Sequence, residues 1–403
     1  MKKQTIIALV AITLTASYLS LAHAWNLFGP SNDTTTVLPA PVPVAPVGDL
    51  PETPVKTSSS AVQVALLLDV SGSMSGLIEQ AKSQLWKIMN ELAILEKPDG
   101  EPDLEMALYV YGSTDNGREK NEILKLLDFT TDMDLFSQKL FELGTSGSSE
   151  YAGEVIGNSL KELEWRAGSD HLKVIYIAGN ESFNQGRISY AQSCGEAVER
   201  SIVVNTIFCG DRNQGRKLDW EKGAIAGKGS YFHIDHNEKT VYIETPYDQQ
   251  INQLNQQLNN TYIPYGAGGV RKKQQQELQD SNAGSYSASN MAERSKFKAS
   301  KKYKAESWDL VDAYQKDKKI VEEKENLPDD LQHNSVAEIE AKIQQITNDR
   351  ERIKKEINEK NKLRTDFITN ATKEDANANS LEGSIIQSID KIAKERGFTK
   401  SKE

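Results

Sequence analysis

The sequence predicts an α/β fold, a doubly wound and mostly parallel sheet with helices on both faces, followed by an all-α helical or coiled-coil C-terminal region. Apolar runs typical of buried strands alternate with stretches of helical periodicity between residues 61 and 234. Beyond residue 265 the composition changes to Lys, Glu, Gln and Asn, which favours helices with narrow apolar faces. The first apolar run, residues 62–69, ends at a carboxylate and marks a candidate site.

The expected elements follow one another in strand–helix order. Strands are expected at residues 62–69, 104–111, 123–129, 172–177, 202–208 and 230–234, with 123–129 as a short edge strand. Helices are expected at residues 75–96, 133–143, 152–165, 189–200 and 219–226. Such units place the carboxyl ends of the parallel strands at one edge of the sheet, and ligands bind outside that edge. The end of the first strand therefore lies where a ligand is expected.

Asp69, Ser71 and Ser73 follow the first strand and offer oxygen ligands close together in the chain. Gly72 lets the backbone turn sharply enough to aim both hydroxyls toward Asp69. A hard cation such as Mg²⁺ prefers oxygen ligands and completes its octahedron with water. These residues therefore predict a divalent-cation site. The alternative is a strand end capped by Asp69, with Ser73 as the N-cap of the next helix.

The segment Leu66-Leu-Leu-Asp-Val-Ser-Gly-Ser-Met74 resembles the first loop of a von Willebrand factor type A domain, whose signature is an Asp-x-Ser-x-Ser metal-ion-dependent adhesion site. The resemblance extends over residues 61–260 through the order of the elements, and it includes residues 226–232 near the last strand. It implies a Rossmann-like fold and Mg²⁺ or Mn²⁺ bound weakly by Asp69, Ser71 and Ser73. It also implies a protein partner that contacts the cation through an acidic side chain.

The resemblance further implies a Thr ligand from a Gly-rich loop before a helix. In this chain the loop is residues 144–151, and no Thr stands in the expected place. Ser148, Ser149 or Glu150 could supply the oxygen there, and we take Ser149 as the candidate.

The resemblance also implies an Asp ligand at the end of the following strand. Gly179 falls on that position, and Asn180 or Glu181 could reach the site from further along. We take Glu181 as the candidate ligand. Both departures bear on the affinity and identity of the metal, and neither bears on the fold.

The N-terminal residues are expected to be an export signal and a linker. Residues 1–24 combine Lys2 and Lys3, an apolar stretch and the cleavage pattern Ala22-His23-Ala24, which is typical of a signal peptide. The alternative is a retained membrane anchor. Residues 25–60 are rich in Pro and predict an extended linker. The mature chain is therefore expected outside the cytoplasm, in a periplasm or in the extracellular space.

Three further segments are expected: the domain at residues 61–265, a polar and partly helical connector at 266–334, and a charged tail at 335–403. Within the connector, residues 274–294 look loosely helical at best.

The tail opens with a capping box at residues 335–338. Isoleucines at heptad-like spacing then predict one long helix, and a second is expected at residues 381–396. The two helices form a hairpin or join a partner chain; the alternative is a solvated helix. We expect the tail to be separable from the domain. Its isoleucines are Ile339, Ile343, Ile346, Ile353, Ile357, Ile385, Ile386, Ile389 and Ile392.

Composition limits the function classes. A formal charge of −10 over 403 residues argues against nucleic acid as a partner, because phosphate binding needs a basic face. No Ser-His-Asp or Cys-His set can be placed, so we expect a protein that is not an enzyme. Two classes remain: an extracytoplasmic module that binds a protein through a divalent cation, and a structural envelope protein that assembles through its tail while its metal site is non-functional.

Overall fold

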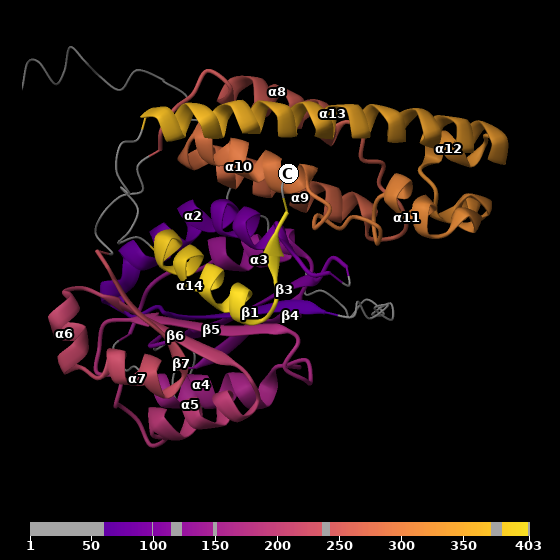
Figure 1. Cartoon of the computed structure of the whole chain (residues 1–403). Coiled ribbons are helices and arrows are strands. Elements are labelled where there is room, and N and C mark those ends of the chain that lie inside the picture. Colours follow the sequence, from indigo (N-terminus) through magenta and orange to yellow (C-terminus); the bar gives the residue numbers. More distant parts are fainter. Residues whose placement is uncertain are drawn as a thin grey trace, which may run out of the picture. The chain divides into compact units, whose positions relative to one another are not determined.

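A six-stranded sheet with the strand order β4-β3-β1-β5-β6-β7 carries the candidate loop (Figure 1). The computed structural model describes residues 60–98, 100–113, 123–147, 151–235, 242–371 and 381–401. The chain divides into two units, Met1–Lys56 and Thr57–Glu403, and every described residue belongs to the second. The expected signal peptide and most of the linker lie outside the described residues. None of the described helices is both long and apolar enough to cross a membrane.

The sheet confirms the predicted fold class. Its strands are β1 (Ala61–Asp69), β3 (Asp103–Tyr111), β4 (Leu124–Thr130), β5 (Leu172–Gly179), β6 (Val203–Cys209) and β7 (Lys228–Ile234). The edge strand β4 runs antiparallel to β3, and the other strand pairs of this sheet are parallel. A second, two-stranded sheet joins β2 (Leu95–Glu96) to β8 (Thr399–Lys400). Chain order reverses between β1 and β5, which makes their carboxyl ends the switch point.

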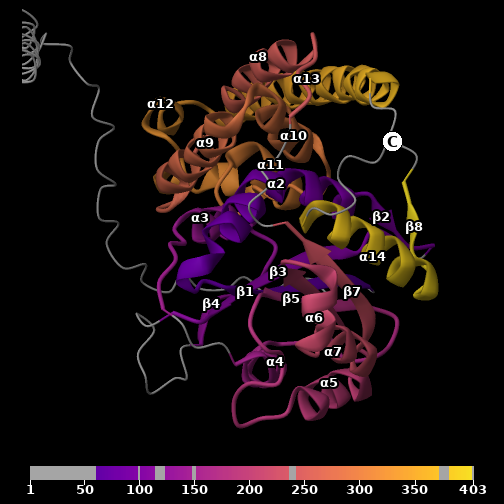
Figure 2. The same ribbon diagram turned by 90° about the vertical axis from the view of Figure 1, so that its left-hand side faces the viewer.

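Helices cover both faces of the sheet, as Figures 1 and 2 show. On one side lie α2 (Ser75–Ala93), α3 (Met133–Phe141) and α14 (Leu381–Glu395); on the other lie α4 (Ala152–Glu162), α5 (Tyr190–Glu199) and α7 (Trp220–Ala226). The short helix α6 (Arg212–Lys217) precedes α7. Every residue of β1 is buried, because alternate side chains face the two helical covers. Val62 and Leu66 belong to one core cluster, and Ala65 and Leu67 belong to the other.

The remaining helices form a further layer, which we call the helical layer (residues 242–371). It comprises α8 (Asp248–Asn259), α9 (Gly269–Tyr286), α10 (Ala288–Ala299), α11 (Leu310–Lys316), α12 (Asp329–Gln332) and α13 (Val336–Ala371), with short 3-10 turns at Lys318–Glu322 and Lys324–Asn326. In Figure 1 this layer lies on the side of α2 and α3 that faces away from the sheet. Residues 274–294, expected to be loosely helical at best, are almost entirely within α9 and α10. Their buried side chains include Gln276, Gln279, Asp280 and Arg294, so the buried face is not apolar in sequence.

The start of the expected tail is confirmed in detail. Ser335 Oγ accepts a hydrogen bond from the backbone N–H of Glu338, whose carboxylate accepts one from the backbone N–H of Ser335. This is the reciprocal capping box that opens α13. The interruption of the isoleucine pattern at Arg350 also has a cause, because the buried guanidinium donates to Asp309 and to Thr261. Four isoleucines of α13 are buried, and the helix packs against α8, α10 and α11. They are Ile339, Ile343, Ile353 and Ile357.

The expectation of a separable tail is wrong for α14. This helix packs against α2 and against β5, β6 and β7, and its Ile385, Ile389 and Ile392 belong to the same core cluster as Val62 of β1. Tyr176 of β5 hydrogen-bonds α14 through Ser388 Oγ at 2.5 Å. The physical reason is that apolar side chains of β5, β6 and β7 on this face of the sheet must be buried from water, and α14 covers them. The domain boundaries near residues 265 and 334 remain predictions.

One side chain on α2 holds both ends of the segment between β7 and α14. The amide nitrogen of Gln80 donates to the carbonyl oxygen of Asp235 at 2.6 Å, and its amide oxygen accepts from the backbone N–H of Leu381 at 3.4 Å. Asp235 directly follows β7, and Leu381 begins α14. The helical layer therefore lies in the chain between the last strand of the sheet and a helix that covers it, and the described residues on either side of that part of the chain meet at Gln80.

Candidate functional site

The loop after β1 begins inside the protein and ends at its surface. Asp69 is fully buried, and its carboxylate accepts a hydrogen bond of 2.7 Å from the backbone N–H of Ser71. Ser71 is buried, whereas Ser73 is exposed. The short 3-10 turn Gly72–Met74 then leads into α2. The interpretation of Ser73 as the N-cap of the helix is not supported, because neither this turn nor α2 has a side-chain cap.

The two hydroxyls of the loop lie close together, with 3.3 Å between Ser71 Oγ and Ser73 Oγ. Adjacent oxygen ligands of an octahedral Mg²⁺ lie about 3 Å apart, since each is about 2.0–2.1 Å from the ion. The spacing of these oxygens is therefore compatible with two neighbouring positions around a hard divalent cation. As predicted from the sequence, both residues stand at the carboxyl end of a central parallel strand.

Neighbouring loops are tied to this loop by backbone hydrogen bonds. The N–H of Val70 donates to the carbonyl of Tyr111 at 2.9 Å, and the N–H of Ser146 donates to the carbonyl of Val70 at 2.8 Å. The N–H of Gly72 donates to the carbonyl of Gly147 at 3.2 Å. The Gly-rich loop that the sequence singled out is thus held beside the Asp-x-Ser-x-Ser loop. Ser149 lies outside the described residues, and so its role as a ligand stays a prediction.

At the end of β5 the structure brings Asn180 rather than Glu181 to the loop. Asn180 Nδ2 donates to Ser73 Oγ at 3.1 Å. Glu181 is exposed, its carboxylate accepts from Gln185 at 3.5 Å, and its carbonyl accepts from the indole N–H of Trp220. Of the two residues that the sequence left open here, Asn180 is therefore the one with a described contact to the hydroxyl pair.

Sequence reasoning did not single out two residues at this edge. Ser113, which follows β3, lies with its hydroxyl 3.0 Å from that of Ser146. Tyr111 stands directly opposite Asp69 in the register of β1 and β3. The signal that could have found both is strand register, because residues at the ends of neighbouring parallel strands meet at one edge.

The donor set fits a hard cation better than a soft one. The loop offers the carboxylate of Asp69 and neutral hydroxyl oxygens, which suit Mg²⁺ or Mn²⁺, whereas zinc prefers Cys and His. Among the described residues no three His, Cys, Asp or Glu side chains gather in a way that could hold a metal. A cation here would be held by Asp69, Ser71 and Ser73, with few protein charges to offset its own.

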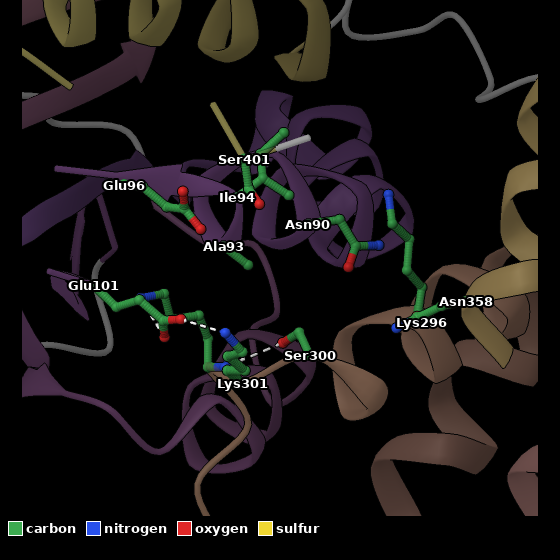
Figure 3. Close-up of a pocket in the computed structure, with 11 residues that line it drawn as sticks. Asn90, Ala93, Ile94, Glu96, Glu101, Lys296, Ser300, Lys301, Asn358 and Ser401 are labelled. Carbon is green, nitrogen blue, oxygen red and sulfur yellow. Dashed lines mark hydrogen bonds and ion pairs between the residues drawn. The ribbon is translucent and has the colours of Figure 1, made fainter. Parts of the chain in front are cut away.

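A cavity at the other end of α2 is separate from this site (Figure 3). Its volume is about 30 Å³, which is room for one or two water molecules. Figure 3 shows polar side chains around it, with Lys301 paired to Glu101 at 2.7 Å. Since α2 is 19 residues long, the cavity lies about 25–30 Å along the helix from Ser73. Its lining residues are Asn90, Ala93, Ile94, Glu96, Glu101, Lys296, Ser300, Lys301, Lys302, Asn358 and Ser401.

Comparisons with known proteins find likeness in structure alone. No protein-family model and no curated protein sequence matches the chain. Among solved structures, a conserved hypothetical protein BatB from Bacteroides thetaiotaomicron aligns with 18% identity and a TM-score of 0.34, covering 43% of this chain and 91% of that one. The SpRpn10 VWA domain aligns with 15% identity and a TM-score of 0.33, covering 43% and 88%. Proximal thread matrix protein 1 from the mussel byssus, with a zinc-occupied MIDAS motif, aligns with 12% identity and a TM-score of 0.32, covering 43% and 41%.

Proposed function

We propose that this chain is an extracytoplasmic protein-binding module whose binding face is the carboxyl edge of the sheet around Asp69, Ser71 and Ser73. The observation that carries the proposal is the pair of hydroxyls 3.3 Å apart beside a buried carboxylate at the switch point of the sheet. The proposed ion is Mg²⁺ or Mn²⁺, bound weakly. Ser149 and Glu181 are retained as proposed further ligands, although the contact of Asn180 with Ser73 favours Asn180 at that edge.

The charge of the site supports an acidic partner group. The buried carboxylate of Asp69 by itself offsets only half the charge of a divalent cation, so the bound ion would attract a carboxylate from a partner. A hard cation also prefers a further oxygen ligand to any other kind. The proposed placement outside the cytoplasm rests on residues 1–24.

Assembly through the tail receives less support. Several isoleucines on which that alternative depends are buried inside the chain: Ile353 and Ile357 of α13 lie within the helical layer, and Ile385 and Ile389 of α14 face the sheet region. Those side chains offer no free apolar stripe to a second copy.

The experiment is affinity capture from a bacterial envelope extract with the purified full chain, in Mg²⁺ and in a chelator. Asp69→Asn keeps the shape of the side chain and removes its charge. Asp128→Ala is the matched control, because Asp128 is exposed on the edge strand β4. We expect the wild type and Asp128→Ala to capture the same protein in Mg²⁺. That protein should be lost when chelator is added or when Asp69→Asn is used. Equal capture under all four conditions contradicts it.

A further inference from the structure

Three residues at the carboxyl edge of the sheet lie in one row across neighbouring strands. Tyr111 of β3 is in register with Asp69 of β1, and Gly179 of β5 follows the last β5 residue that pairs with β1. The residues two positions earlier on these strands, Tyr109, Leu67 and Ile177, share one core cluster on the side of α4 and α5. Because side chains alternate along a strand, the side chains of Tyr111 and Asp69 face this same side, and so would a side chain at position 179.

Gly179 has no space for a side chain. A Cβ atom at this position would lie 2.5 Å from the phenol oxygen of Tyr111, and 3.2 Å from both the Cβ and Oδ2 of Asp69. Tyr111 is 1% exposed, and its hydroxyl donates to the carbonyl of Ala178 at 2.8 Å. The phenol is therefore held by its buried surroundings and by a hydrogen bond, so moving it aside costs free energy.

We infer that Tyr111 and Gly179 are a matched pair in which the tyrosine hydroxyl fills the space that a side chain at position 179 would occupy beside Asp69. Tyr111 is therefore the residue that keeps an acidic side chain at position 179 from joining the carboxylate of Asp69. The inference deepens the proposed function and rests on it for the cation, whereas the pairing of the two residues rests on their contact alone.

The contact is tested by a double-mutant cycle on the full chain, read as thermal unfolding. Gly179→Ala in the wild type should lower the Tm by about 5 °C or more, because the methyl group overlaps the phenol oxygen. In a Tyr111→Phe background, which lacks only the hydroxyl, the same substitution should lower the Tm by less than half as much. Equal shifts in the two backgrounds overturn the pairing.

The charge is tested by adding the missing carboxylate. Tyr111→Ser with Gly179→Asp makes room for an acid beside Asp69, and Tyr111→Ser with Gly179→Asn is its neutral control. Titration with Mn²⁺, followed by calorimetry, should show at least about tenfold tighter binding for the acidic variant than for the wild type or the neutral control, since a hard cation gains a charged oxygen ligand. Circular dichroism confirms that both variants fold.

The two possible failures are distinguishable. If the wild type binds Mn²⁺ and the acidic variant binds no tighter than its neutral control, the role of Tyr111 in excluding a carboxylate from the site is overturned while the proposed cation stands. If neither the wild type nor the acidic variant binds Mn²⁺, the cation of the proposed function is overturned and the charge role of Tyr111 falls with it. In that case the double-mutant cycle still decides whether Tyr111 and Gly179 are a pair.

Discussion

The interior of the sheet region (residues 60–235 and 381–401) and its contact with the helical layer (residues 242–371) use different combinations of buried groups. In the sheet region the strands and their covering helices bury apolar side chains on both faces. The helical layer shares one of these apolar clusters, with the ring of Phe297 of α10 5.6 Å from that of Trp86 of α2. It also adds buried charges at the contact: Arg294 of α10 is fully buried, with Nη2 2.6 Å from Asp134 of α3 and Nε 3.0 Å from Asp280 of α9. Its guanidinium also lies 4.2 Å from the centroid of the Trp86 ring of α2.

The two kinds of buried contact have different consequences. Apolar burial is non-directional and stabilises the fold wherever it occurs. A buried ion pair stabilises the fold only if its partners are placed well enough to offset their desolvation. Burial raises the pKa of the Asp280 carboxyl, but Lys298 and Arg294 outweigh that effect and hold the pKa at about 2. Burial lowers the pKa of Lys298 to about 8 even beside Asp280. We infer that apolar burial stabilises both regions, and that the buried charges fix where the helical layer sits on α2 and α3.

The largest expected effect comes from removing α14. A chain that ends at residue 380 should lose its cooperative unfolding transition. Each buried Ile or Leu of α14 contributes about 1.5–3 kcal/mol, and four such residues, Leu381, Ile385, Ile389 and Ile392, amount to much of the stability of a typical domain. Thermal unfolding followed by circular dichroism measures this.

The matched chain lacks residues 236–380 and joins β7 to α14 by a linker of about four to six residues. Because Gln80 holds both ends of this segment, such a linker can span them. We expect this chain to keep a cooperative transition at a lower Tm, since Trp86 and its neighbours lose their cover. If it is unfolded while the chain ending at residue 380 folds, the assignment of α14 to the sheet region is wrong.

The next effect is expected at the charged contact itself. Arg294→Met leaves Asp134 and Asp280 buried without their shared partner, so the free energy of unfolding should fall by about 3–5 kcal/mol. Arg352→Met is the control, because Arg352 is exposed on α13 and pairs with Glu356 one turn away; its loss should cost under about 0.5 kcal/mol. Urea unfolding of the three chains gives both values. Similar losses for both variants would mean that the buried pairs do not hold the helical layer.

The same contrast explains what could be predicted from the sequence. The central strands β1 and β5 are largely apolar runs, and β1 begins and ends within a residue of where it was expected. The buried residues of α9 include Gln276, Gln279 and Asp280, and no large apolar side chain is among them, so no apolar periodicity marks this face. The place of α14 was missed for another reason: its amphipathic pattern predicts a helix but does not identify the surface that the helix covers. At the site, Asp69, Ser71 and Ser73 stood out because they share one loop, while Tyr111 depended on register between strands.

A smaller, pH-dependent effect is expected at the amino edge of the sheet. Nδ1 of the buried His171 accepts a hydrogen bond of 3.1 Å from the backbone N–H of Ala61. Burial lowers the pKa of His171 below 6.5, and the charges of Arg166 and Lys173 lower it further, while Asp170 opposes them. Folding therefore favours the neutral ring, so this contribution is complete above pH 6.5 and is lost as the pH falls below it.

Between pH 7 and pH 5 the wild type should lose more stability than His171→Gln, whose amide oxygen can accept the same hydrogen bond without titrating. Urea unfolding at the two pH values measures the difference. Parallel losses in the two chains would show that another group is responsible.

The most direct test of the account is a calorimetric titration of the full chain with Mn²⁺. If the oxygens of the β1 loop hold a cation, the wild type should bind with a dissociation constant on the order of 10⁻⁴–10⁻³ M, the weak end of oxygen-ligand sites. The chain lacking residues 236–380 should bind alike, because Asp69, Ser71 and Ser73 belong to the sheet region. Asp69→Asn should give no heat beyond dilution. Equal heats from the wild type and Asp69→Asn would contradict the assignment of the site.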